Sequence, residues 1–197
     1  MRRIEEFWVE FSSMQEDDDT PASSLTNAVY DVLDSFKGAV VAVFIIFALV
    51  FRVVGVEGDS MNPTLESGDW LAVSSILTEF EAGDIVVVTQ PWERNVPIIK
   101  RVIAIGGDTV YIDFETNEVF VNGVLLEENY IAEPTFVSYD VEFPVTVEEG
   151  KVFVMGDNRN VSLDSRSSKI GMIDERYILG KTLGRISPIS EWNIYED

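Results

Sequence analysis

The chain of 197 residues contains no cysteine and no histidine. Without cysteine it has no disulfide, no thiolate nucleophile and no cysteine-ligated zinc. Without histidine it has no Ser-His-Asp triad and no imidazole ligand for a metal. The redox state of its compartment stays open, because an oxidising location does not require cysteine. A serine nucleophile in this chain would therefore need a lysine or a carboxylate as its base.

Positive charge is also scarce. The sequence has 14 Lys and Arg residues against 35 Asp and Glu residues, which gives a net charge of −21. Nucleic-acid binding needs clustered basic residues, so we expect no nucleic-acid partner. The balance fits an acidic, solvated surface, as in a saline or cation-rich setting. The length and an apolar content of 46% suffice for one medium domain plus a membrane anchor.

The first 36 residues are polar and acidic, with an acidic cluster at 16–19. This composition predicts a solvated tail over residues 1–36. A short amphipathic helix is expected within it, from Leu25 to Phe36.

Continuous apolar sequence follows from Gly38 to Phe51, bounded by Lys37 and Arg52, and Val53–Val56 extends it. Because Arg52 can reach the headgroups, the run predicts one transmembrane helix over 37–56. A buried core helix and a cleavable signal peptide are the alternatives. The acidic leader and the lack of a small-x-small site argue against the second.

The basic residues near this run suggest an orientation. Arg2, Arg3 and Lys37 precede it, whereas residues 53–93 contain no Lys or Arg. The bias predicts a single-pass protein of the cell membrane, with a cytoplasmic amino terminus and an extracytoplasmic domain over 57–197.

The sequence after residue 57 has the features of a β protein. Asn122-Gly123 between two apolar triplets predicts a two-residue hairpin. Short β-branched or alternating runs predict strands at 84–89, 96–105, 110–113, 118–121 and 152–155. We therefore expect a mostly β fold, with an antiparallel sheet folded over itself or closed into a barrel. No glycine-rich phosphate loop is present, and no cofactor or metal is expected.

Three segments carry residues suited to chemistry, and Ser60 begins the first of them, Ser60–Leu65. Gly58 and Pro63 restrict the backbone around the serine, so its side chain and its N–H are held at a fixed angle. That N–H is suited to binding an oxyanion. Taken alone, the serine is also compatible with a turn that has no catalytic role.

Lys100 lies in the second segment, an apolar strand. In a strand Ile98, Lys100 and Val102 share one face, and an amine on an apolar face loses part of its affinity for a proton. If the pKa of Lys100 falls by two or three units from its usual value of about 10.4, the amine becomes a usable base. Arg101 then points to the opposite face, where a carboxylate can pair with it. The alternative is a solvated edge-strand lysine.

The third segment is the polar loop 156–166 that follows a buried strand. Ser162 is suited to orienting an uncharged lysine by a hydrogen bond. Asp164 and Arg166 are expected to form an ion pair that fixes the loop. A surface loop rich in turn-forming residues is the alternative.

Together these segments resemble the conserved boxes of bacterial type I signal peptidases, which are membrane-anchored Ser-Lys endopeptidases. The resemblance runs from the apolar run to about Gly184. The matching residues, in order, are Ser60-Met61-x-Pro63-Thr64-Leu65, Gly83-Asp84-Ile85-Val86, Lys100-Arg101-Val102-Ile103 with Gly107-Asp108, and Gly156-Asp157-Asn158-Arg159-x-x-Ser162-x-Asp164-Ser165-Arg166.

The resemblance implies a role for each matching position. Ser60 would be the acylating nucleophile and Lys100 the general base. Ser162 would orient Lys100, and Asp164 and Arg166 would be structural supports.

The resemblance also implies a signal-peptidase-like β catalytic domain with one amino-terminal transmembrane helix and an apolar rim that dips into the lipid bilayer. The substrates would be secretory preproteins with small residues at the first and third positions before the cut. Met61, Leu65 and Ile99 would lie near the shallow apolar cleft that binds them.

Two positions depart from the family pattern. Gly58 stands where some members have a serine whose hydroxyl joins the oxyanion hole, and Gly106 stands where a proline is common. Two other functions remain alternatives: a self-cleaving Ser-Lys protease of related fold, and a membrane-tethered β-sheet binding module without activity.

Overall fold

The structure is a computed structural model that describes residues 21–77, 79–89, 96–188 and 192–195. The chain divides into two units, one ending at Leu49 and the other running from Val50 to the carboxyl terminus. The acidic cluster at 16–19 lies outside the described residues.

The described residues of the first unit all lie in helix α2, Pro21–Val50. The expected amphipathic helix and most of the apolar run form this one helix, in which Lys37 pairs with Asp34 one turn earlier at 2.9 Å. The expected helix end at Val56 is wrong. The helix ends at Val50, because the β-branched residues that follow pair as a strand. Within the part of the chain that the structure describes, no helix combines the length and the apolar composition of a bilayer span.

A seven-stranded antiparallel sheet dominates the second unit, in the order β1-β2-β11-β3-β4-β9-β10. The expectation of a mostly β, antiparallel fold is thus confirmed. The strands of this sheet are β1 (Phe51–Gly55), β2 (Trp70–Ser74), β3 (Ile85–Val88), β4 (Ile98–Ile105), β9 (Lys151–Met155), β10 (Ile173–Asp174) and β11 (Ile178–Ser187). A single 3₁₀ turn, η1 (Glu175–Tyr177), joins the last two.

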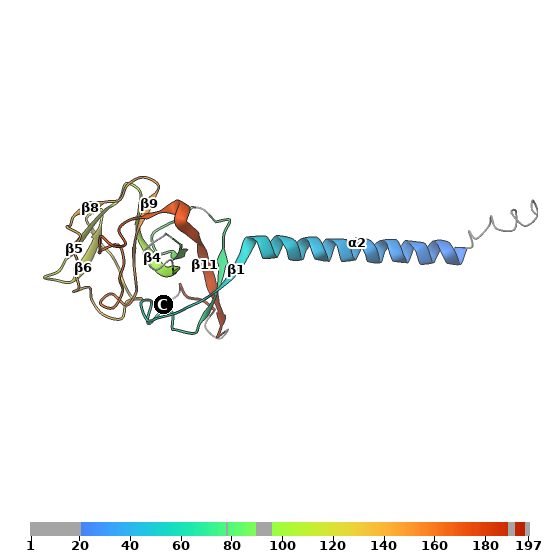
Figure 1. Ribbon diagram of the computed structural model, residues 1–197, viewed down its shortest axis with the longest axis horizontal. Helices are drawn as coiled ribbons and strands as arrows, with labels where there is room; N and C mark the ends of the chain where they lie inside the picture. The colour runs from blue at the N-terminus through green and yellow to red at the C-terminus, as the bar shows by residue number, and fades with distance from the viewer. Residues whose placement is uncertain (1–20, 78, 90–95, 189–191, 196–197) are drawn as a thin grey trace, which may run out of the picture. The chain divides into compact units, whose positions relative to one another are not determined.

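A smaller antiparallel sheet has the order β7-β6-β5-β8 and lies at the other end of this unit from β1 and β11 (Figure 1). The predicted two-residue hairpin is confirmed, because Val121 pairs with Val124 across Asn122 and Gly123, both at positive φ. The strands of this sheet are β5 (Thr109–Asp113), β6 (Glu118–Val121), β7 (Val124–Leu125) and β8 (Val145–Thr146).

The pairing of β4 determines where a site can form. All four residues of β3 are buried, and β3 pairs with β4 from Ile98 to Arg101. On its other side β4 pairs with β9 only from Arg101 to Ile105. Among the described strands, none therefore pairs with residues 98–100 on that side, and β1 is one of the two edge strands of the same sheet.

Candidate active site

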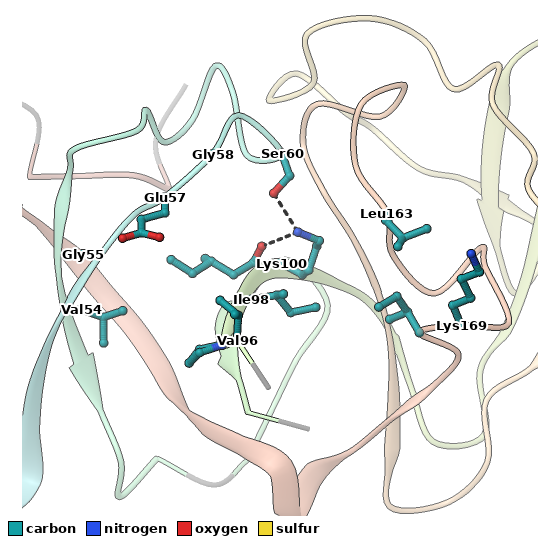
Figure 2. Close-up of a pocket in the computed structure, with 13 residues that line it drawn as sticks. Val54, Gly55, Glu57, Gly58, Ser60, Val96, Ile98, Lys100, Leu163 and Lys169 are labelled. Atoms are coloured by element: carbon teal, nitrogen blue, oxygen red, sulfur yellow. Dashed lines mark hydrogen bonds between the residues drawn. The ribbon is translucent and has the colours of Figure 1, made fainter. Parts of the chain in front are cut away.

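Ser60 and Lys100 meet at the free edge of β4. The Lys100 Nζ donates a hydrogen bond to the Ser60 Oγ at 2.8 Å and another to the Ile99 carbonyl oxygen at 2.9 Å. Figure 2 shows the two side chains pointing toward each other. Lys100 is only 3% exposed, while Ser60 is half-buried and remains accessible. The geometry allows the hydroxyl proton to pass directly to the amine whenever the amine is neutral.

Burial lowers the pKa of Lys100 from 10.5 to about 8. The carboxylates of Asp164 and Asp157 act in the opposite direction, and the Arg166 guanidinium adds slightly to the lowering. Near neutral pH about a tenth of the molecules therefore carry a neutral amine. The apolar strand thus gives Lys100 the property of a usable base.

The loop that carries Ser60 is held by the loop 156–166. The Asn158 N–H donates to the Ser60 carbonyl oxygen at 3.1 Å, and the Asn158 Nδ2 donates to the Asp59 carbonyl oxygen at 3.0 Å. Gly58, two residues before the nucleophile, has a φ of +87°, which favours glycine there. The segment therefore presents Ser60 from a fixed backbone.

Ser162 is fully buried beside this contact. A Cβ added at Gly156 would overlap both the Ser162 Oγ and the Ser60 carbonyl oxygen, so the three residues are packed closely together. Among the described residues the Ser162 Oγ has no hydrogen-bond partner, and Lys100 donates to Ser60 and Ile99 instead. The predicted hydrogen bond between Ser162 and Lys100 is not formed.

Asp164 and Arg166 form the expected ion pair, with two hydrogen bonds of 2.8 and 2.9 Å between fully buried side chains. The Asp164 carboxylate also accepts the Gly156 N–H at 3.0 Å. Arg166 reaches the Val137 carbonyl oxygen at 2.9 Å and the Arg159 carbonyl oxygen. The ion pair thus closes the loop 156–166 and joins it to the segment around Val137.

A second buried ion pair joins the three segments. Arg101 contacts the Asp157 carboxylate at 2.8 and 2.7 Å, and the Thr64 hydroxyl donates to the same carboxylate. The Tyr130 ring lies over the Arg101 guanidinium at 3.9 Å. The alternation of β4 predicted a carboxylate partner for Arg101 on the face opposite Lys100, and Asp157 is that partner. Nothing in the sequence pattern indicated Tyr130.

Arg159 was named within the third segment, but the sequence pattern gave it no role. It is fully buried, forms an ion pair with Glu128, and donates to the Thr135 hydroxyl at 3.0 Å. A buried guanidinium needs several partners, and the side-chain partners of Arg159 lie far from it in sequence. Its position directly after Gly-Asp-Asn was therefore the only available signal.

The cleft beside the pair has a volume of about 1100 Å³. Ile99 lines it, as expected. Met61 and Leu65, by contrast, are 1% and 0% exposed and belong to the core cluster beneath, so they do not line the cleft. The residues that line it are Val54, Gly55, Glu57, Gly58 and Ser60 on one side, residues 96–100 in and just before β4, Leu163 from the third segment, and Lys169 and Ile170 shortly after that segment.

A serine hydroxyl bonded to a buried amine, at the edge of a cleft large enough for a polypeptide, fits a hydrolase that acts on peptides. Among the described residues no group of three or more Asp and Glu side chains is placed to hold a metal ion.

Comparison with known proteins agrees with a hydrolase that acts on peptides. Residues 29–186 match the family described as signal peptidase, peptidase S26. The chain is 38% identical to signal peptidase I of Bacillus licheniformis over 84% of this chain and 92% of that protein. It is 38% identical to a probable signal peptidase I-1 of Synechocystis over 76% and 81% of the two chains.

Among solved structures, a signal peptidase I from Enterococcus faecalis is 32% identical and covers 52% of this chain and 96% of that one, with a TM-score of 0.42. The chain belongs to the signal peptidase family, peptidase S26. It is a hydrolase of the signal peptidase type.

Proposed function

We propose that this chain removes amino-terminal signal peptides from secretory preproteins with a Ser60-Lys100 dyad. The hydrogen bond of 2.8 Å between the Lys100 amine and the Ser60 hydroxyl carries the proposal, together with the lowered pKa of Lys100. With no histidine in the chain, the buried lysine is the base available at this serine.

In the first half of the reaction, neutral Lys100 accepts the hydroxyl proton while the Ser60 Oγ attacks the scissile carbonyl carbon. The carbonyl oxygen becomes an oxyanion, for which the Ser60 backbone N–H is the donor we propose. When the C–N bond breaks, the Lys100 ammonium returns its proton to the leaving amine. The signal peptide stays bound to Ser60 as an ester.

In the second half, Lys100 takes a proton from water as the water oxygen attacks the ester carbonyl carbon. The Ser60 Oγ leaves and regains a proton from Lys100, so the enzyme is restored and the signal peptide departs with a new carboxyl group. Ser162, Asp164 and Arg166 support this geometry in the proposal: Ser162 packs against the nucleophile segment, and the ion pair holds the loop.

The substrate lies extended in the cleft. No described strand pairs with residues 98–100 of β4 on that side, and Val54 and Gly55 of β1 form the facing wall, so main-chain hydrogen bonds can hold a peptide strand. The resemblance to type I signal peptidases implies small residues at the first and third positions before the cut.

We also propose that the chain works at a membrane, with its amino terminus cytoplasmic and its catalytic unit outside. Val40, Val41, Val43, Phe44 and Ile45 of α2 are each more than half exposed, which disfavours a helix free in water. Retention of the chain in membranes after an alkaline wash would support this attachment, and release into the wash would contradict it.

The activity is tested with a purified preprotein in detergent. Wild type is expected to cut after a small-x-small sequence, and Ser60→Ala is expected not to cut. A preprotein with a bulky residue at the last position before the cut is the matched control and should stay intact. Cleavage by Ser60→Ala would remove the serine from the mechanism, and a well-folded wild type that cuts nothing would favour a binding module.

A further inference from the structure

Most cations of this chain are neutralised by a carboxylate. Of the eleven Lys and Arg residues in the described part of the sequence, eight form an ion pair. The three without one among the described residues are Arg52, Lys100 and Lys169. In a chain with 35 acidic residues, a lysine without such a partner is unusual. Lys100 is explained by its place beside Ser60, but Lys169 is not.

Lys169 lines the same cleft as the catalytic pair. In the view of Figure 2 it lies beyond Leu163, on the other side of Ser60 and Lys100 from Glu57. Its side chain is exposed, so its charge is available to a molecule in the cleft.

The backbone on both sides of Lys169 is fixed. The N–H of the preceding Ser168 donates to Asp140 at 2.8 Å, and the Ser168 hydroxyl donates to the same carboxylate. The N–H groups of Ile170 and Gly171 both donate to the Ser167 carbonyl oxygen, at 3.0 and 2.8 Å. Lys169 is therefore presented from an ordered turn, which lowers the entropic cost of using it for recognition.

We propose that Lys169 determines substrate specificity by pairing with an acidic side chain of the bound preprotein, close to the scissile bond. This inference rests on the proposed function. The molecule as a whole carries a net charge of −21 and repels acidic peptides at long range. Lys169, which has no carboxylate partner among the described residues, reverses that effect at its side of the cleft, so one acidic residue is favoured there and further acidic residues are not.

The test uses the full chain in detergent and pairs of preprotein peptides that differ only by Glu or Gln at one position. The position is moved along both sides of the cut, and kcat/KM is measured for each member. At one position wild type should prefer Glu about fivefold, the upper range for a solvent-accessible ion pair. That preference should disappear in Lys169→Met, reverse toward Lys-containing peptides in Lys169→Glu, and shrink at 1 M salt.

Lys151→Met is the matched control, because Lys151 is a partly exposed lysine outside the cleft and should leave the Glu preference intact. A wild type that shows no Glu preference at any position would overturn the inference, and so would a preference that survives in Lys169→Met. Both results leave the proposed function standing. Failure to cut every peptide, Gln and Glu alike, would overturn the proposed function itself and the inference with it.

Discussion

Lys100 combines two properties that oppose each other in most lysines: it is buried, and it is bonded to a hydroxyl that solvent can reach. Among the described residues its amine has a serine hydroxyl and a main-chain carbonyl as hydrogen-bond partners, and no carboxylate of these residues contacts it directly. Burial without a contacting anion is what keeps its pKa near 8. The same burial costs stability whenever the amine is charged.

That cost has a definite pH dependence. The pKa of Lys100 is about 8 in the folded chain and 10.5 in the unfolded chain, so the unfolded state binds more protons between these values. Below pH 8 the full cost of burying the charged amine is present, and this cost is relieved as the pH rises to 10.5. Relative to Lys100→Met, wild type should gain about 3 kcal/mol of unfolding free energy over this window.

Urea unfolding of both proteins at several pH values measures this difference. Tyrosines titrate in both proteins, so their contribution cancels in the comparison. Parallel stability curves for the two proteins from pH 7 to 10.5 would contradict the lowered pKa.

Gly156 is a second decisive residue. A side chain there would overlap the Ser162 Oγ and the Ser60 carbonyl oxygen, and the Ser60 carbonyl oxygen cannot move without moving the nucleophile segment. Gly156→Ala should lower kcat/KM by about 100-fold or more, because small displacements of reacting groups have effects of this size. Gly123→Ala, at a glycine far from the site in sequence and outside the cleft, is the matched control. Normal cleavage by Gly156→Ala would show that the packing is looser than described.

At the scale of elements, β4 determines the site, and the sequence predicted this strand with its start two residues too early. Its alternation placed Lys100 and Arg101 on opposite faces and anticipated a carboxylate partner for the arginine, which is Asp157. The hairpin at Asn122-Gly123 was equally predictable, because its turn requires positive φ at both residues.

Other elements were not predictable from local patterns. β11 pairs with both β2 and β3, yet its sequence of mixed Gly, Lys and Arg residues lacks an apolar alternation. Gly180 and Gly184 are required there because other segments of the same chain, at Ser74 and Trp192, approach them closely. Such an approach is a property of the tertiary fold. The end of α2 at Val50 is likewise determined by the pairing of β1 with β2.

The hairpin offers a test that separates stability from activity. Gly123 has a φ of +78° with open space around its Cα, so alanine there meets backbone strain alone. Gly123→Ala should lower the unfolding free energy by about 1 kcal/mol and leave kcat/KM unchanged. Gly38→Ala, in a helix and also in open space, is the control and should cause no loss. Thermal unfolding and peptide cleavage measure the two quantities, and an activity loss in Gly123→Ala would link this hairpin to the site.

At the scale of the whole molecule, charge is the dominant feature. With 35 acidic and 14 basic residues the surface repels itself, and salt reduces that repulsion. Raising NaCl from 0.05 to 1 M should raise the melting temperature by about 5 °C. Calorimetry at constant pH measures this, with sucrose at matched osmolality as an uncharged control. A melting temperature that falls or stays constant in NaCl would show that acidic repulsion does not limit stability.

The most direct test of the Ser60-Lys100 dyad is the pH dependence of kcat/KM for a preprotein peptide between pH 6 and 10. A lysine base with a pKa of about 8 predicts a rate that rises tenfold per pH unit below pH 8 and levels off above it. Lys100→Ala should show no cleavage across the range. A flat profile, or near-wild-type cleavage by Lys100→Ala, would contradict lysine as the general base.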